Sequence, residues 1–376
     1  MAAQQGVRPR TPLLAVVALA LLAATWSVPA PALAALPPQG FAVVSMTSTY
    51  DDLFSPSTTG NPVTDGGLVA GSTVVGRYPR AAVYDLNRHT LRVLGTLGGR
   101  SSWGTDINAA GDVVGYSDLP NLGETHAFVW TARTGMMHDL GAFAGRGDYS
   151  QANAINDAGV VVGWGTLDRP GTSPRAFVWD PNVSPVRMRE LPLPASTRSS
   201  TATAVNARGQ VVGRATGDSD EGFLWDPTTA SSSVLGSLPG ARIAGAVDIN
   251  DSGYVVGPAE VSRSGPSGPY VVPRPYRWSP ATRTAALLIS APGAGYDEVS
   301  AINRHGVIVG TAHRDDLNRL AVWNACSTPV YLQPAPGGRA SGGAGLNRYG
   351  EIVGTSQASP TRGAEFVRSG PCVATP

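Results

Sequence analysis

Arginine and tyrosine side chains recur in the segments that join one repeated sequence unit to the next. The candidates for ligand binding are Arg100, Arg146, Tyr149, Arg242, Tyr296 and Arg339. Guanidinium groups bind carboxylates and phosphates through paired hydrogen bonds. If these segments share one face of the fold, they predict a funnel that binds an anionic ligand, such as an acidic glycan. The alternative is that surface loops need charge and this chain, which contains no lysine, supplies it with arginine.

Metal-ligating, nucleophilic and paired acidic residues form no recognisable pattern in the sequence. The five histidines have no ligand spacing of the His-x-x-x-His kind. No Gly-x-Ser-x-Gly elbow lies between a strand and a helix. The acidic run from Asp218 to Glu221 lacks the twelve-residue loop of a calcium-binding hand. We therefore expect no metal ion, no cofactor and no catalytic residues.

One sequence unit is repeated along the chain. Its core, Ile-Asn-x-x-Gly-x-Val-Val-Gly, is clearest from Ile107 to Gly115, and a weaker copy runs from Val63 to Gly71. The glycines that end the seven copies are Gly71, Gly115, Gly163, Gly213, Gly257, Gly310 and Gly354. Their mean spacing of about 47 residues matches the period of propeller blades.

Each unit divides into short strands. The residues before Asn form a first strand and the Val-Val-Gly run forms a second, joined by a tight turn that Asn caps and in which Gly takes a left-handed conformation. A third strand reads Phe-Val-Trp, and a looser fourth strand follows. We expect the recurring tryptophans to pack between units rather than to stack on sugars. They are Trp130, Trp179, Trp225, Trp278 and Trp323.

These units predict an all-β fold, a seven-bladed β-propeller with about four antiparallel strands per blade. The last unit ends after its third strand, and residues 41–46 offer a spare N-terminal strand that would complete it and close the ring. An open solenoid and a six-bladed ring are the alternatives. The composition agrees, because 46 Gly and 31 Pro disfavour helices. A net charge of +1 also lacks the basic excess of nucleic-acid-binding proteins.

Residues 1–34 have the pattern of a secretory signal peptide. Arg8 and Arg10 precede an apolar run over residues 13–26, and Ala32-Leu33-Ala34 supplies the small residues of a cleavage site. The run is shorter than the roughly 20 residues of a membrane span, and no later stretch is long enough. We therefore expect a secreted, extracellular or periplasmic protein in which residues 35–376 form a single propeller domain. An uncleaved anchor is the alternative.

The chain has two cysteines, Cys326 and Cys372, which follow the third strands of consecutive units. In an exported protein this arrangement favours a disulfide that ties the C-terminal tail to the sixth unit. Two free thiols are the alternative.

The repeat motifs resemble those of a known family. The segment His126-Ala127-Phe128-Val129-Trp130, the Ile-Asn-x-x-Gly-x-Val-Val-Gly copies and a following Leu-Gly-Gly are similar to the extracellular HAF-repeat proteins of bacteria. One copy has the literal His-Ala-Phe, and most other third strands begin with Arg. The resemblance implies export and a repeat architecture, and it brings no established catalytic site.

Together these patterns predict a secreted, monomeric binding or interaction module rather than an enzyme, with a glycan or an envelope protein as its partner. A polysaccharide hydrolase or lyase is the first alternative, and as a glycosidase it would need two carboxylates about 5–10 Å apart. The second is a cell-envelope scaffold that binds proteins through its rim.

Overall fold

The computed structural model describes residues 42–45, 54–120, 123–143, 149–167, 173–265, 268–290, 295–314, 317–323, 329–332, 338–358 and 362–368. All of them belong to one unit, Leu36–Pro376. Within these ranges the regular structure is β-strand, as the composition predicts.

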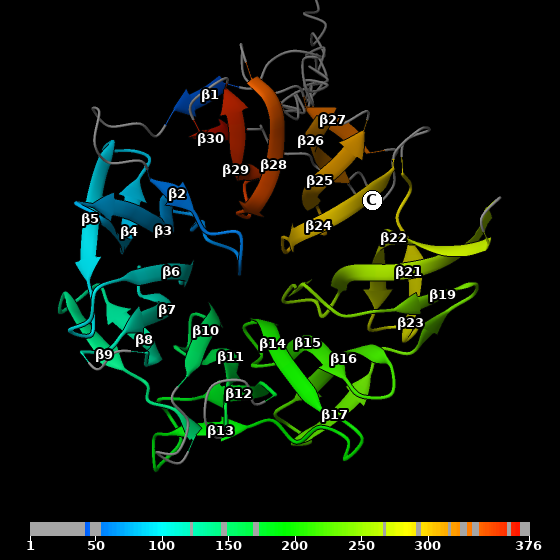
Figure 1. The fold of residues 1–376 in the computed structure, drawn as a ribbon, viewed down its shortest axis with the longest axis horizontal. Helices are drawn as coiled ribbons and strands as arrows, with labels where there is room; N and C mark the ends of the chain where they lie inside the picture. Colours follow the sequence, from blue (N-terminus) through cyan, green and yellow to red (C-terminus); the bar gives the residue numbers. More distant parts are fainter. Residues whose placement is uncertain are drawn as a thin grey trace, which may run out of the picture. The chain divides into compact units, whose positions relative to one another are not determined.

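The described residues form seven antiparallel sheets, which we number in chain order (Figure 1). Sheet 1 contains β2 (Ser55–Pro56), β3 (Leu68–Val75), β4 (Tyr78–Asp85) and β5 (Thr90–Gly95). Sheet 2 contains β6 (Ser102–Ile107), β7 (Val113–Asp118), β8 (Thr125–Thr131) and β9 (Met136–Asp139). Sheet 3 contains β10 (Ser150–Ile155), β11 (Val161–Gly165), β12 (Arg175–Trp179) and β13 (Met188–Glu190). Sheet 4 contains β14 (Ser199–Val205), β15 (Val211–Thr216), β16 (Asp220–Asp226) and β17 (Ser231–Val234).

Sheet 5 has more strands than the repeat predicts. It contains β18 (Ser237–Leu238), β19 (Ala241–Ile243), β20 (Asp248–Ile249), β21 (Val255–Gly265), β22 (Gly268–Ser279) and β23 (Thr284–Leu287). The first strand is divided into β19 and β20, which both pair with β21, and β18 adds a short hairpin. Sheet 6 contains β24 (Tyr296–Ile302), β25 (Ile308–Arg314), β26 (Leu317–Trp323) and β27 (Val330–Leu332).

Sheet 7 is built from both ends of the unit. Its strands are β28 (Gly338–Leu346), β29 (Glu351–Ala358), β30 (Arg362–Arg368) and β1 (Ala42–Ser45). The N-terminal strand β1 is antiparallel to β30, with Ala42 opposite Arg368 and Ser45 opposite Glu365. The prediction that an N-terminal strand completes the last unit is therefore confirmed.

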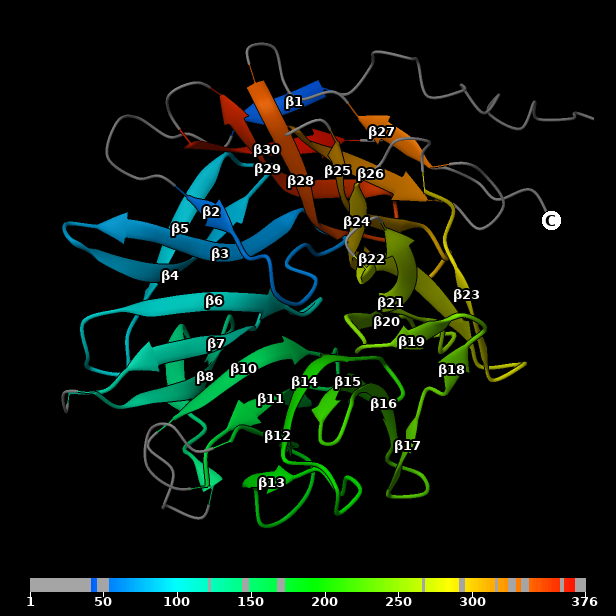
Figure 2. The same cartoon turned by 45° about the vertical axis from the view of Figure 1, so that its right-hand side comes forward.

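The hydrophobic core lies between neighbouring sheets. Phe128 and Trp130 of sheet 2 pack against Ala81 of sheet 1, and comparable clusters join each following pair. Val353 of sheet 7 packs against Tyr84 of sheet 1, so the last sheet also contacts the first. This packing explains why the strands are apolar on both faces, and Figure 2 shows the sheets side by side. Four of the recurring tryptophans are buried as predicted, and the exception, Trp179, is partly exposed.

In sheets 2, 3, 4, 6 and 7 the first two strands are joined by the predicted turn, and in sheet 5 this turn joins β20 to β21. In sheet 3, Asn156 Oδ1 accepts hydrogen bonds from the backbone N–H groups of Ala158 and Val160. Gly159 has a φ of 80°, the left-handed conformation that glycine adopts without strain. Because the first strands lie nearest the centre (Figure 1), these turns meet around one axis.

Candidate functional site

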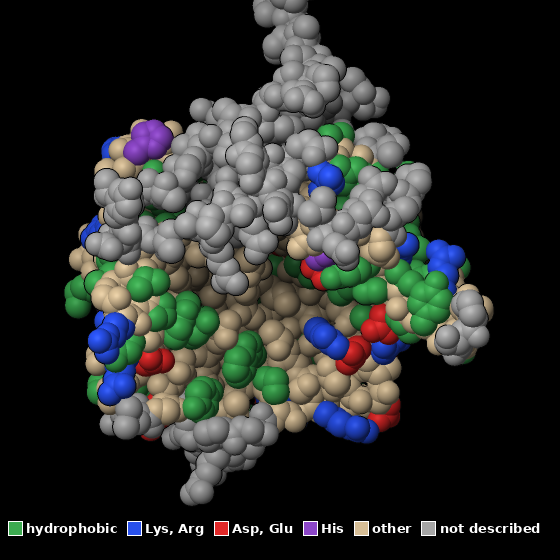
Figure 3. Space-filling model, turned by 45° about the horizontal axis from the view of Figure 1, so that its top comes forward, with side chains coloured by type: hydrophobic (Ala, Val, Ile, Leu, Met, Phe, Trp, Pro, Cys, Tyr) green, Lys and Arg blue, Asp and Glu red, His purple; other side chains and the backbone are tan. Residues whose placement is uncertain are grey.

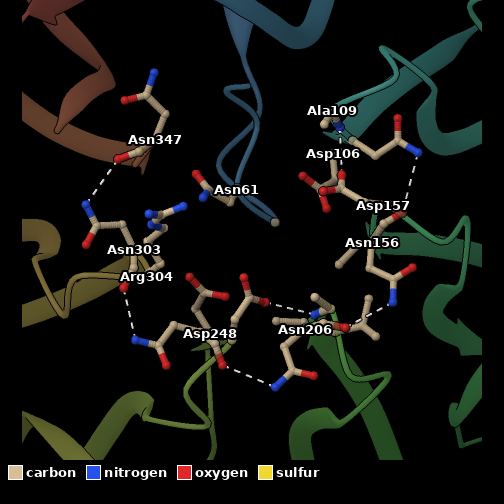
Figure 4. Close-up of a pocket in the computed structure, with 18 of the residues that line it drawn as sticks. Asn61, Asp106, Ala109, Asn156, Asp157, Asn206, Asp248, Asn303, Arg304 and Asn347 are labelled. Atoms are coloured by element: carbon tan, nitrogen blue, oxygen red, sulfur yellow. Dashed lines mark hydrogen bonds between the residues drawn. The ribbon is translucent and has the colours of Figure 1, made fainter. Parts of the chain in front are cut away.

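The turns between the first and second strands surround a cavity of about 230 Å³ (Figure 4). Each of the seven sheets, or the segment before it, contributes lining residues. They are residues 60–61, 63–65, 106–109, 154–157, 204–207, 248–251, 302–304 and 346–348. Since groups from seven copies of the repeat converge here, this cavity is the candidate functional site.

A ladder of asparagine side chains forms much of the cavity wall. Each asparagine of the turn donates an Nδ2 hydrogen bond, 3.0–3.4 Å long, to the backbone carbonyl at the same position in the next sheet. The donors are Asn108, Asn156, Asn206, Asn250, Asn303 and Asn347. The ladder stops in sheet 1, where Thr64 stands in place of asparagine and its Oγ1 accepts from the N–H of Leu68.

A segment of residues 57–62, between β2 and β3, reaches from sheet 1 into the centre of the ring (Figure 1). The Asn61 side chain exchanges two hydrogen bonds of 2.9 Å with the backbone of Leu346 in sheet 7. Gly60 has a φ of 71°, and a Cβ there would lie 2.7 Å from the carbonyl oxygen of Asn153. Glycine is therefore required where this segment passes sheet 3.

Two aspartates lie in the wall where other copies of the repeat have Ala or Gly. Asp106 is 5% exposed, and its carboxylate accepts hydrogen bonds from the backbone N–H groups of Asn61, Ile107 and Ile155. Burial raises the pKa of Asp106 to about 8, and the negative charge of Asp248 adds to the rise. The N–H donors oppose this shift without reversing it.

Asp248 repeats this arrangement between sheets 5 and 6. Its carboxylate accepts from the N–H groups of Ile249 and Ile302, each at 2.8 Å. Burial raises the pKa of Asp248 to about 7, with a further contribution from the charge of Asp251. Both aspartates therefore join neighbouring sheets, and both titrate near neutral pH.

The mouth of the cavity carries charged side chains at the position after the asparagine. Asp157 Oδ1 accepts from Ala109 N–H at 2.8 Å, and Asp251 Oδ1 accepts from Ala207 N–H at 2.9 Å. Asp65 forms an ion pair with Arg348 at 3.0 Å. Arg304 lies in the lining without an ion pair to any described residue (Figure 4). Exposed carboxylates from sheets 3 and 5 and a guanidinium from sheet 6 thus line the same cavity.

Four of the ligand-binding residues predicted from the sequence have described side chains, and none of the four lines this cavity: they are Arg100, Tyr149, Arg242 and Tyr296. The Arg100 guanidinium lies 6.0 Å from the ring centre of Tyr78. Arg242 is in β19 rather than in a loop, and its guanidinium pairs with Glu260 at 2.5 Å and donates to the carbonyl of Asp220.

The predicted tyrosines also have neighbours of their own. Tyr296 begins β24, and its ring stacks on His313 at 3.9 Å. Tyr149 forms an isolated bridge with Thr125. Among the described side chains, no hydrogen bond, ion pair or ring contact joins any two of Arg100, Tyr149, Arg242 and Tyr296.

The side chains of four further predicted residues lie outside the described part of the structure. Arg146, Cys326 and Cys372 lie outside the described residues, and Arg339 lies in β28 with its side chain outside the described part. Figure 3 shows one face of the molecule with acidic and basic side chains adjacent to each other. Ion pairs such as Arg214–Asp220 and Arg242–Glu260 agree with this mixing of charges.

The aspartates at positions 106, 157, 248 and 251, and Arg304, are the site residues that sequence reasoning missed. A signal existed for Asp106 and Asp248, because the same position holds Ala154, Ala204, Ala301 and Gly345 in other copies. Within the described ranges, no group of three or more His, Cys, Asp or Glu side chains is arranged to hold a metal ion. The same ranges contain no helix long and apolar enough to cross a membrane.

Comparison with known structures gives the fold. An oligogalacturonate lyase from Vibrio parahaemolyticus is similar with a TM-score of 0.60 at 13% identity, over 86% of this chain and 93% of the lyase. The β-propeller domain of the Trilobed protease from Pyrococcus furiosus is similar with a TM-score of 0.54 at 12% identity, over 85% of this chain and 94% of that domain. The fold is that of a β-propeller.

Other comparisons add to this propeller assignment without adding a function. Virginiamycin B lyase from Staphylococcus aureus is similar with a TM-score of 0.51 at 12% identity, over 88% of this chain and 99% of the lyase. Residues 144–311 match a family described as a protein of unknown function, DUF3466. No curated protein matches the chain in sequence.

Proposed function

We propose that residues 35–376 form an exported, closed, seven-bladed β-propeller that binds a small polar ligand in its central cavity. The seven sheets of the described residues, the β1–β30 pairing and the packing of sheet 7 on sheet 1 support the closed ring. The signal-peptide pattern of residues 1–34 and the resemblance to HAF-repeat proteins support export.

The chemistry of the cavity mouth indicates the class of ligand. Asp157 and Asp251 each have one carboxylate oxygen that accepts a backbone N–H, which leaves the other oxygen as an acceptor. Arg304 offers guanidinium donors to the same space. Sugar hydroxyls both donate and accept hydrogen bonds, so one sugar unit complements this set.

The size and charge of the cavity narrow the ligand further. A cavity of about 230 Å³ is smaller than the roughly 300–1,000 Å³ of pockets for drug-sized ligands. Even without Asp106 and Asp248, whose pKa values are raised, the lining has more acidic than basic side chains, which makes an anionic ligand unfavourable there. The remaining acids are Asp65, Asp157 and Asp251, and the bases are Arg304 and Arg348. The cavity therefore suits a single neutral or amine-bearing sugar unit, free or at the end of a glycan.

The face that carries the predicted arginines offers a second binding site, which would take an anionic glycan. Arg242 would attract such a ligand only weakly, because its guanidinium already forms an ion pair with Glu260. Arg100 carries no ion pair to a described residue and remains the stronger candidate on that face.

A polysaccharide hydrolase or lyase is the alternative function. In its favour, Asp106 and Asp248 have pKa values raised to about 8 and about 7, as expected of general acids. Against it, both carboxylates already accept backbone hydrogen bonds from two sheets, which suits a structural role. The similarity to oligogalacturonate lyase, which has also been solved with manganese, extends only to the fold.

Ligand-observed NMR with a panel of neutral and amino monosaccharides, on the purified full chain, tests the proposal. The matched variants are Asp157→Asn with Arg304→Gln, and Asp218→Asn as a control, since the Asp218 side chain is 86% exposed outside the cavity. We expect a panel member to bind the wild type and the control, and to bind the double variant at least tenfold more weakly.

Product analysis on polysaccharide substrates is run in parallel. Binding that the double variant retains would place the ligand elsewhere and contradict the proposed site. Turnover that Asp106→Asn abolishes would support the enzyme instead. Capture of an envelope protein without binding of any sugar would support the alternative function of a cell-envelope scaffold.

A further inference from the structure

A buried serine joins neighbouring sheets at three places in the ring. In each case its Oγ accepts a 2.9 Å hydrogen bond from an N–H group in the third strand of the preceding sheet. The serines are Ser102, Ser150 and Ser200, and the donors are Ala81, Ala127 and Ala176. Two of these hydroxyls also donate to the carbonyl of the glycine that follows or ends the preceding fourth strand, Gly95 or Gly141.

Asp297 occupies this position in sheet 6. It lies opposite Ala312, two residues after Gly310, just as Ser102 lies opposite Ser117, two residues after Gly115. Its neighbour on the same face of the strand, Val299, packs against sheet 5. The Asp297 carboxylate therefore faces sheet 5.

The facing strand of sheet 5, β22, also differs from the third strands of sheets 1, 2 and 3 at the matching position. The three donors each lie three residues before the aromatic residue of the third strand, and the residue three before Trp278 in β22 is Pro275. Proline has no N–H to donate. Strands β22 and β24 pack against each other, so the junction between sheets 5 and 6 has a carboxylate in place of the hydroxyl and no donor in place of the amide.

The result is a buried carboxylate without a partner. Asp297 is 2% exposed, and neither Oδ1 nor Oδ2 has a hydrogen-bond partner. The buried hydroxyl of Ser290, seven residues earlier in the segment after β23, also has none. The Ile289 carbonyl, which follows the fourth strand, accepts from Trp323 Nε1 at 2.9 Å. Buried charges in proteins are normally paired or bound to metal ions.

We propose that the junction between sheets 5 and 6 binds a hard divalent cation at the Asp297 carboxylate. Both carboxylate oxygens are available as ligands, and the Ser290 hydroxyl is a further oxygen close in sequence. Calcium prefers such oxygen ligands and tolerates irregular geometry. A single carboxylate predicts weak binding, in the range of about 0.1–1 mM found for extracellular calcium modules.

Thermal unfolding of the chelator-treated full chain, with and without 5 mM CaCl₂ at matched ionic strength, tests this site. For a dissociation constant of about 0.5 mM, linkage gives an increase in the folding equilibrium constant of about tenfold, and therefore a higher Tm. Asp297→Ser restores the residue of the other junctions and removes the buried carboxyl group. Because it lacks the carboxylate, it should fold and show no calcium-dependent rise in Tm.

Two further variants serve as controls for this experiment. Glu298→Gln changes the adjacent carboxylate, whose side chain is 62% exposed, and it should keep the full calcium response. Asp297→Asn keeps the shape of the side chain and should lose the response even if Asp297→Ser does not fold. An unchanged wild-type Tm with calcium, or a response that survives in either Asp297 variant, would overturn the proposal.

Discussion

The asparagine of the recurring turn forms hydrogen bonds in two directions. Within its own sheet, Asn206 Oδ1 accepts from the N–H groups of Arg208 and Gln210. Across the junction, its Nδ2 donates to the carbonyl of Asn250. The first role is local and follows from the Asn-x-x-Gly spacing. The second role depends on how closely two neighbouring sheets pack, and the residue spacing within one repeat does not predict that distance.

Asn206→Ala should destabilise the fold by about 2–4 kcal/mol, because it leaves two N–H groups and one carbonyl without their partner. Chemical denaturation gives this free energy directly. The control is Asn182→Ala, since Asn182 lies in an exposed turn and its amide contacts Ala158 at 3.3 Å. The control should change stability by less than about 0.5 kcal/mol. If the two variants changed the free energy of unfolding equally, the asparagine ladder would not be a source of stability.

Asp106 makes the stability of the ring depend on pH. Its pKa is about 8 in the folded chain, whereas an unfolded aspartate titrates near 3.9. The folded state therefore holds a proton that the unfolded state has lost, so the contribution of Asp106 to stability is fully present below about pH 4 and falls as the pH rises towards 8. Asp248, with a pKa of about 7, acts in the same direction.

Asp106→Asn should flatten this dependence between pH 5 and 8, whatever its effect on absolute stability. The measurement is the free energy of unfolding at several pH values, with Asp218→Asn as the exposed control. A slope identical to that of the wild type would mean that Asp106 is ionised throughout this range.

At the level of the strands, the glycine that ends each copy of the repeat motif lies inside a strand, where the neighbouring strand comes close to it. The first strand carries a β-bulge opposite or beside this glycine in sheets 2, 3, 4, 6 and 7. In sheet 3, a Cβ on Gly163 would collide with the carbonyl oxygen of Gln151 and lie 2.9 Å from the Cα of Ala152. All of these atoms belong to the backbone, so the strands cannot move aside locally.

Gly163→Ala should therefore destabilise the fold by about 1–3 kcal/mol or more. Gly66→Ala is the matched control, because the nearest atom to its Cβ would be Thr64 Oγ1 at an ordinary 3.7 Å. Unfolding midpoints in urea compare the two. If Gly163→Ala were as stable as Gly66→Ala, the close approach of β10 and β11 would not be the reason for the glycine.

The repeat predicted most of the strands because its signal is local and occurs seven times. It could not predict β18 or the division of the first strand into β19 and β20, which occur in one sheet only. It also could not show that Glu260 lies opposite Arg242, because this pairing depends on the register of β19 and β21. The cavity was missed for the same reason, because its residues converge only when the sheets are arranged around one axis.

For the unit as a whole, the pairing of β1 with β30 joins the N-terminal strand to the last sheet. A chain that lacks residues 1–46 should lose a few backbone hydrogen bonds worth roughly 1 kcal/mol each, and β30 would become an edge strand. We expect it to be less stable by about 2–4 kcal/mol and to exchange amide hydrogens faster over residues 362–368.

The control for this truncation is a chain that lacks only residues 1–34, which should match the full chain in stability. Slow exchange over residues 362–368 in both chains would show that β1 is not needed to complete the sheet.

The central claim is that seven copies of one unit form a ring whose function lies in the cavity at its axis. A crystal structure of the chain soaked with the sugar that binds most tightly tests it most directly. We predict density for the sugar between Asp157, Asp251 and Arg304. Density instead on the opposite face, beside Arg100 or Tyr149, would contradict the claim.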